Sequence, residues 1–351
     1  MSGTPVSPGS GWGGHPSGSA LSRRRLLGLG AALPVLAGCT LSTPTMSDAT
    51  RTPSPAGTTP VPSPSPSASR TPSEPPVVAG AEAAATTELA LAELAGAILA
   101  GPRRRELSVD QRALLRFVAD AHRNHAAVLD ASVRAPRPAD VAPLTLRQSL
   151  VRLARAEAAA AGRHRAAALG VSGDDSLRFG SVAAAADLYA RVVTADRRVR
   201  TSAGPRTPPV LARSTDTVAV QSLVAQLHAL VYGYQLAIGR MPVAGEQDDQ
   251  AVDELRSHRI RRDRLISWLR RREAEVPVPE PAYRPSVDVR DGATGVRLVR
   301  TMLVALQPFA GIWLASAADA EREWALSFFG TTVGLAHGWG APLPVWPGSA
   351  G

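Results

Sequence analysis

The sequence predicts an all-α protein in which two consecutive four-helix bundles follow a disordered signal and tether region. Alanine and leucine dominate the composition and aromatic residues make up only 4%, which favours helices over strands. From residue 81 onward, apolar residues recur at steps of three and four, as they do on one face of a helix. Prolines and glycines interrupt this spacing in the same short, long, short order twice.

The predicted first bundle spans residues 81–200 and the second spans 214–351, with a linker rich in Pro, Gly and Arg at 201–213. In each half the long connection contains several prolines, which cannot continue a helix. A long connection of this kind allows the chain to cross over from the second helix of a bundle to the third. The eight predicted helices are 81–100, 108–133, 145–169, 176–198, 214–238, 247–272, 292–316 and 319–337.

Residues 1–38 are typical of a bacterial export signal. Arg23 and Arg24 precede an apolar stretch, residues 26–37, which is shorter than the roughly 20 residues that span a bilayer. The paired arginines resemble a twin-arginine signal, and the general secretion route is the alternative. The ending Leu-Ala-Gly-Cys resembles a lipobox, in which Cys39 receives lipid and becomes the new N-terminus. We therefore expect a lipoprotein on the extracytoplasmic face of the cell membrane.

Residues 39–80 are rich in Ser, Thr and Pro and are predicted to form an extended tether. Cys39 is the single cysteine, so disulfides within the chain and cysteine-based zinc sites are excluded. The net charge is +9, but no basic run is interleaved with aromatic residues, so we expect no nucleic-acid binding. The expected partners are the membrane, through lipid on Cys39, and an envelope protein or wall component.

The C-terminal half carries several unusual segments in a fixed order. They are residues 228–234 (HALVYGY), 258–263 (HRIRRD), 279–283 (PEPAY) and 339–348, which holds Trp339 and Trp346. With these segments, residues 214–348 resemble the ferritin-like domain of the DUF4439 family found in actinobacterial proteins. The resemblance implies a ferritin-like bundle with a helix crossover. We also expect the tail with its two tryptophans to fold back over the second bundle.

A ferritin-like di-iron site needs glutamates from two helices and Glu-x-x-His from the other two. In the C-terminal half the candidate ligands are His228, Glu254 and His258, but Glu254 and His258 are four residues apart rather than three. Leu227 and Gln307 stand where the resemblance leads us to expect acidic residues. The sequence therefore predicts a degenerate metal site in this half.

The N-terminal half offers His122 and His125, which share one helix face, and Glu157 and His164, which are two turns apart. Further acidic candidates are Glu88 and Glu93 on the first helix, Asp120 on the second and Asp187 on the fourth. Two interpretations stay open. These residues form a metal site, or they are charged groups on exposed faces with histidines half-buried at the seam.

No nucleophile elbow, phosphate loop or His-Glu-x-x-His motif occurs in the chain. The first hypothesis is therefore a lipid-anchored, non-catalytic binding module without a cofactor. The alternative is a metal-dependent redox or metal-handling protein that uses di-iron or another divalent metal. Twin-arginine export of folded proteins favours this alternative.

Overall fold

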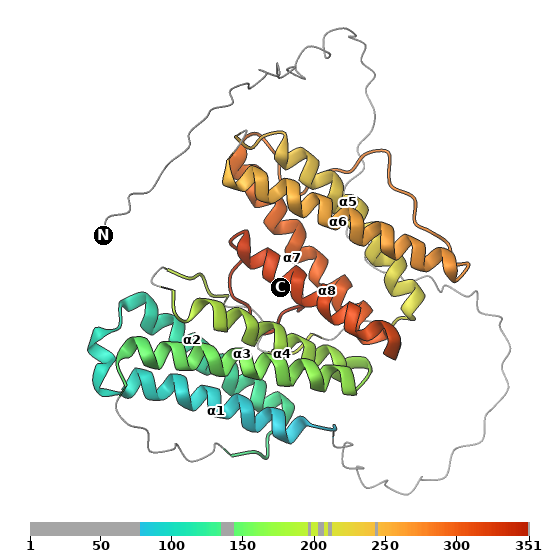
Figure 1. The fold of residues 1–351 in the computed structure, drawn as a ribbon. Helices are drawn as coiled ribbons and strands as arrows, with labels where there is room; N and C mark the ends of the chain where they lie inside the picture. The colour runs from blue at the N-terminus through green and yellow to red at the C-terminus, as the bar shows by residue number, and fades with distance from the viewer. Residues whose placement is uncertain are drawn as a thin grey trace, which may run out of the picture. The chain divides into compact units, whose positions relative to one another are not determined.

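The computed structural model describes residues 78–134, 144–195, 198–202, 207–209, 213–242 and 245–349. Within these ranges the chain forms eight α-helices and one 3-10 helix, and its only β-type pairing is an isolated bridge (Figure 1). The all-α prediction is confirmed. The predicted signal residues Arg23 and Arg24, the lipidation residue Cys39 and residues 39–77 of the tether lie outside the described residues.

The first four helices pack in a chain of neighbours: α2 and α3 each contact α1, and α4 contacts α3. Helices α2 and α3 begin at capping boxes, in which Ser108 and Thr145 exchange hydrogen bonds with a glutamine three residues later. The bounds are α1 (Ala81–Ala100), η2 (Pro102–Glu106), α2 (Val109–Leu129), α3 (Leu146–Gly170) and α4 (Gly173–Val192). Helix α4 begins before the predicted start at 176, because Asp174 and Asp175 in its first turn favour the positive end of the helix dipole.

The second four helices repeat the plan, with α5 packed against α6 and α7, and α8 packed against α7. Their bounds are α5 (Asp216–Ile238), α6 (Glu246–Arg271), α7 (Gly292–Ser316) and α8 (Asp319–Gly338). The long connection between α6 and α7 lies where the sequence predicts it. Pro308 is inside α7, which nevertheless continues to Ser316.

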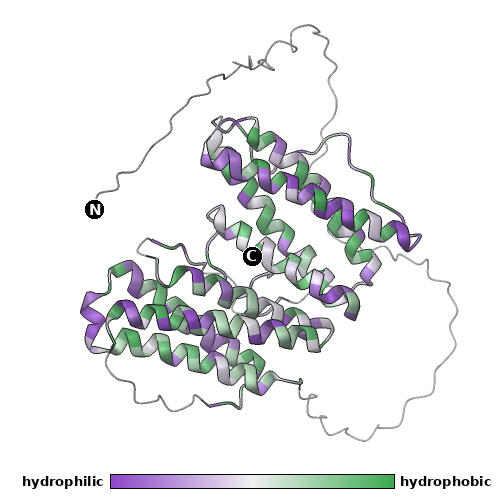
Figure 2. Cartoon of the chain, in the orientation of Figure 1, coloured by the Kyte–Doolittle hydropathy of each residue, from purple (hydrophilic) through white to green (hydrophobic). Residues whose placement is uncertain are grey.

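The two sets of helices also pack against each other. Helix α8 contacts α3 and α4, and α7 contacts α4. A Cβ on Gly180 of α4 would lie 2.6 Å from Leu314 Cδ2, so this glycine permits the close approach of α7. The described helices belong to one compact unit, and the predicted boundary at 201–213 stays a prediction. Figure 2 shows the most hydrophilic stretch along α6, whose exposed residues are largely arginine and aspartate.

After α8, the C-terminal tail lies against both sets of helices. The indole Nε1 of Trp339 donates to Glu254 Oε2 of α6 at 2.7 Å, as expected for a tail over the second bundle. The tail also reaches the first four helices, which this expectation does not include: Trp346 Nε1 donates to Asn124 Oδ1 of α2 at 2.7 Å. The tail reaches α2 because Gly340, with φ of +84°, turns the chain after α8.

Two described helices, α1 and α7, are long and apolar enough to cross a membrane by length and composition alone. Each packs against several neighbours, and each buries a polar side chain, Glu88 in α1 and Gln307 in α7. These are features of core helices in a folded unit.

Candidate metal centre

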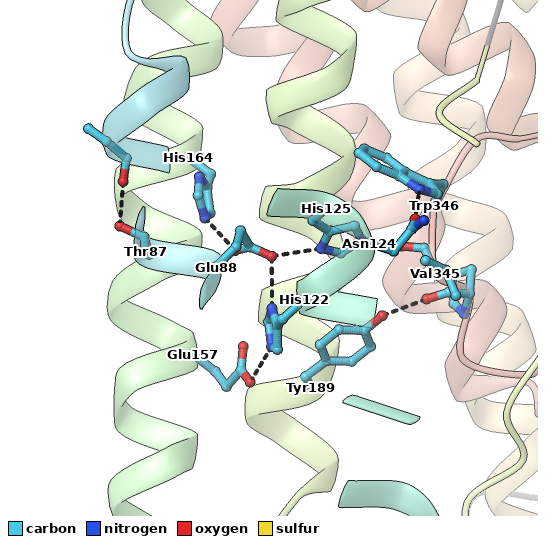
Figure 3. A network of polar contacts seen from close by, with 12 residues as sticks. Thr87, Glu88, His122, Asn124, His125, Glu157, His164, Tyr189, Val345 and Trp346 are labelled. Atoms are coloured by element: carbon cyan, nitrogen blue, oxygen red, sulfur yellow. Dashed lines mark hydrogen bonds and ion pairs between the residues drawn. The ribbon is translucent and has the colours of Figure 1, made fainter. Parts of the chain in front are cut away.

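Five ionisable side chains from three helices meet in the interior of the first four helices (Figure 3). None is more than 1% exposed, so the interpretation that places them on exposed faces or half-buried is wrong. They are Glu88 of α1, His122 and His125 of α2, and Glu157 and His164 of α3. The structure thus brings together four of the predicted ligands and Glu88, one of the further acidic candidates.

Glu88 is the centre of the cluster. Its Oε2 accepts hydrogen bonds from Nδ1 of His122 and Nδ1 of His125, both at 2.7 Å. Its Oε1 accepts from Nε2 of His164, also at 2.7 Å. The buried face of α1 around Glu88 is largely alanine, and these small side chains leave room for three imidazole rings.

The Nε2 atoms of His122 and His125, which point away from Glu88, also lie within hydrogen-bonding distance of an oxygen. Nε2 of His122 lies 2.8 Å from Glu157 Oε1, and Nε2 of His125 lies 2.7 Å from the Val345 carbonyl oxygen. A carbonyl oxygen only accepts, so Nε2 of His125 carries a proton. Both rings therefore turn Nδ1 toward Glu88 while an acceptor holds Nε2. Metal-ligating histidines are commonly oriented by such outer acceptors.

Burial and the neighbouring charges shift the pKa values of Glu88, His122 and Glu157. Burial opposes ionisation of Glu88, but the charge of His122 and hydrogen bonds from the histidines outweigh it, so the Glu88 pKa lies well below its usual range. Burial also disfavours charged His122, yet Glu157 and Glu88 raise its pKa to about 10. Burial raises the pKa of Glu157, a shift that His122 partly offsets.

Glu157 and Tyr189 complete the surroundings. Oε2 of Glu157 is buried and finds no hydrogen-bond partner among the described residues. Tyr189 of α4 stands perpendicular to His122, with ring centroids 5.5 Å apart. Burial, together with the charges of Glu157 and Glu88, raises the Tyr189 pKa well above its ordinary value. Its neutral hydroxyl donates to the Pro344 carbonyl at 2.8 Å.

Glu88, His122 and His125 could together hold a metal ion, because their ligand atoms all lie within 4.8 Å of one another. Two imidazoles and a carboxylate form a ligand set that suits first-row divalent metals, including non-haem iron. The 2.7 Å separations are those of hydrogen-bonded pairs, so a metal would replace the two Nδ1 protons. The unpartnered oxygen of Glu157 is a further donor beside this set.

The three candidates of the C-terminal half do not join this cluster. The carboxylate of Glu254 is already engaged: Oε2 accepts from Tyr234 at 2.5 Å and from Trp339 at 2.7 Å, and Oε1 accepts from Gln250 at 2.8 Å. A carboxylate held by three donors is a structural hydrogen-bond acceptor in this conformation.

His258 is fully buried, and its ring nitrogens find no partner in the described structure. Burial and the nearby charge of Arg261 lower its pKa to about 3, so the ring is neutral near pH 7. A cation beside the ring disfavours a metal ion there. His228 of α5 has a pKa lowered by burial and by Arg262, and it belongs to no metal-binding group found among the described residues.

Tyr189 and Val345 are site residues that the sequence prediction lacks, and Glu88 is among its further acidic candidates. Glu88 had a signal, because it is a charged residue at helical spacing among buried Ala and Leu positions of α1. Tyr189 reads as an ordinary core aromatic. Val345 acts through its backbone carbonyl, which leaves no signal in the side-chain pattern.

Comparison with known protein families gives a match in the second half of the chain. Residues 219–351 match the family described as Domain of unknown function (DUF4439). This confirms the predicted DUF4439 resemblance, and the five clustered residues lie before the match. A comparison with curated proteins gave no match.

One solved structure is similar: a conserved hypothetical protein, rv2844, from Mycobacterium tuberculosis. It is 26% identical, and the alignment covers 35% of this chain and 93% of that chain with a TM-score of 0.33.

The His122 pairing predicts a loss of stability at alkaline pH. Its pKa is raised in the folded state, from 6.5 to about 10, so its contribution is full below pH 6.5 and is lost as pH rises through 10. The chain has no lysine, so no side-chain ammonium group titrates in this range. The free energy of unfolding of metal-free protein should fall by about 1.4 kcal/mol per pH unit between pH 7.5 and 9.5.

Urea unfolding with chelator present measures this slope. His122→Asn should be less stable at pH 7.5 but should show a much flatter pH dependence. Parallel slopes for the two proteins would show that His122 is not charged in the folded state.

Proposed function

We propose that this chain is a lipid-anchored envelope protein whose N-terminal helices hold one divalent transition-metal ion for a redox or metal-handling role. Glu88, His122 and His125 would be the ligands. Glu157 and the Val345 carbonyl would hold the outer histidine nitrogens, and His164 would hold the second Glu88 oxygen. The observation that carries the proposal is the convergence of three histidines on one fully buried carboxylate.

The energetics favour a functional reason for this cluster. Removing charged groups from water is expensive, and replacing a buried ion-pair network by apolar residues of similar volume is often neutral or stabilising. Strongly shifted pKa values such as those of Glu88 and His122 concentrate at functional sites for the same reason. A bound ion would supply Lewis-acid or redox chemistry, while these side chains bind it, orient it and exclude water.

This geometry favours the metal-dependent alternative over the non-catalytic binding module. The alternative to a metal site placed the acids on exposed faces and the histidines half-buried at the seam, and the burial of all five does not fit that interpretation. The proposed site is mononuclear, because the ligand atoms that come together in the described part of the chain form a single triad. Envelope location and lipid on Cys39 remain part of the proposal from the signal-like residues 1–38.

Elemental analysis of the full chain, exported through its own signal and purified without chelator, tests the metal. We expect about one equivalent of iron, manganese, zinc or another first-row metal, since one triad provides one site. Glu88→Gln and His122→Ala should lose the metal, because each removes a ligand. Glu93→Gln, five residues away on the same helix, is the matched control and should retain it.

A metal-free protein in which Glu88→Gln and Glu93→Gln behave alike would rule out the metal site. A tethered binding module would then be the better account, and its partner would be sought by crosslinking in the envelope.

Lipid anchoring predicts that Cys39→Ala moves the protein from the membrane fraction to the soluble extracytoplasmic fraction, because the acyl chains supply the membrane affinity. Fractionation and metabolic labelling with fatty acid measure this, with Ser42→Ala as the control.

Replacing Arg23 and Arg24 by lysines should block export if the route is twin-arginine. Unchanged export would indicate general secretion, and membrane retention of Cys39→Ala would contradict the anchor.

A further inference from the structure

The C-terminal strap is defined as residues 343–349. It lies against α2 and α4 beside the proposed metal centre. Its sequence, LPVWPGS, contains two prolines, which have carbonyl oxygens but no N–H donors. Such a segment satisfies its surplus acceptors only if neighbouring residues supply donors. In this chain, side chains of the N-terminal helices supply them.

Three consecutive contacts join the strap to these helices. The Pro344 carbonyl accepts from Tyr189 at 2.8 Å, the Val345 carbonyl accepts from His125 at 2.7 Å, and the Pro347 carbonyl accepts from Ser181 at 2.7 Å. Tyr189 and His125 are themselves packed against the His122 ring. The strap therefore contacts His125, which is hydrogen-bonded to Glu88, and Tyr189, which packs against His122 (Figure 3).

Trp346 closes the same face. Its ring lies 4.6 Å from the His125 ring, and its Nε1 donates to Asn124 Oδ1 at 2.7 Å. Only 2% of Trp346 and 8% of Val345 is exposed, and His125 beneath them is fully buried. Water and ions therefore have no direct route to His125 past the strap in this conformation.

The strap is fixed at both ends and backed by a cavity. Leu343 exchanges backbone hydrogen bonds with Arg200 and Ser202, at 2.8 Å each. At the other end, the Gly348 N–H donates to Gln307 Oε1 at 3.3 Å, and a Cβ on Gly348 would lie 2.9 Å from Phe329. A cavity of about 140 Å³ lies beside the middle of the strap, lined in part by Leu188, Val333, Val345 and Trp346. The middle thus has space to move into while Leu343 stays paired.

We propose that the strap is the closing and positioning element of the metal centre. It must move aside for a metal ion to enter or leave, and its Val345 carbonyl holds the Nε2 proton of His125 so that Nδ1 faces Glu88. This inference rests on the proposed metal-binding function. It assigns a role to the end of the DUF4439 match, which supplies the cover for a site built by helices outside that match.

Two buried serines of α4 provide a matched pair for the test. Ser181 Oγ donates to the strap at 2.7 Å, whereas Ser176 Oγ donates to the Ala168 carbonyl at 2.8 Å, away from the strap. Both are fully buried. Full-length protein loaded with Co²⁺ is mixed with excess chelator, and loss of the visible Co²⁺ absorption gives the release rate. Losing one strap hydrogen bond should speed release about fivefold in Ser181→Ala, and Ser176→Ala should match wild type.

Trp346→Phe is an independent second variant, because it loses the bond to Asn124 but keeps an aromatic ring on His125. It should also speed release about fivefold, and the double variant with Ser181→Ala about 25-fold if the two bonds act independently. Trp339→Phe, whose indole binds Glu254, is its control and should leave the rate unchanged.

The visible absorption spectrum of bound Co²⁺ tests whether the strap positions His125. A chain ending at Pro342 should show a shifted Co²⁺ absorption, because His125 loses its Nε2 acceptor. A synthetic peptide of residues 343–351 should restore the wild-type spectrum and slow release, while the peptide with alanine in place of Trp346 should not.

The outcomes separate the two claims. If wild type binds Co²⁺ but Ser181→Ala and Trp346→Phe release it at the wild-type rate, the strap inference is wrong and the metal site stands. If wild type binds no Co²⁺, the proposed function and this inference both fail.

Discussion

The hydrogen bonds between one buried carboxylate and three histidines constrain the N-terminal half more than any other contact. Glu88 reaches His122 and His125 of α2 and His164 of α3, so it joins three helices at one point in the interior. Each of these groups is costly to bury alone, because an unpaired charge loses its hydration without compensation. Two further features support this cluster. The alanine-rich face of α1 leaves room for the imidazole rings, and Glu157 pairs with His122.

The same constraint adds a polar link between the two halves, beside the packing of α7 and α8 against α3 and α4. His125 needs an acceptor for Nε2, and Tyr189 needs one for its hydroxyl, in an interior that water does not reach. Both acceptors are carbonyls of the C-terminal strap, which belongs to the DUF4439 match. The second set of helices, whose own candidate ligands are engaged or neutral, thereby contributes to the site through its tail.

Much of the fold could be predicted, because helix periodicity, caps and proline breaks are local signals. The predicted bounds of α1, α7 and α8 agree with the structure to within a residue. Four ligand candidates were also predicted, since His122 and His125 share a helix face and Glu157 and His164 lie two turns apart. The burial of these groups could not be predicted, because it depends on α1 and α3 packing together. Val345 was inaccessible to sequence reasoning, as its contribution is a backbone oxygen 220 residues from His125.

Anomalous diffraction from crystals of the protein loaded with its native metal tests the central claim most directly. The account predicts one strong peak about 2.0 to 2.2 Å from Glu88 Oε2, His122 Nδ1 and His125 Nδ1, with His122 still paired to Glu157. A peak beside Glu254 and His258, or no peak and the three residues still within 2.7 Å hydrogen bonds, would contradict it. In the latter case the cluster is a proton-bridged structural network.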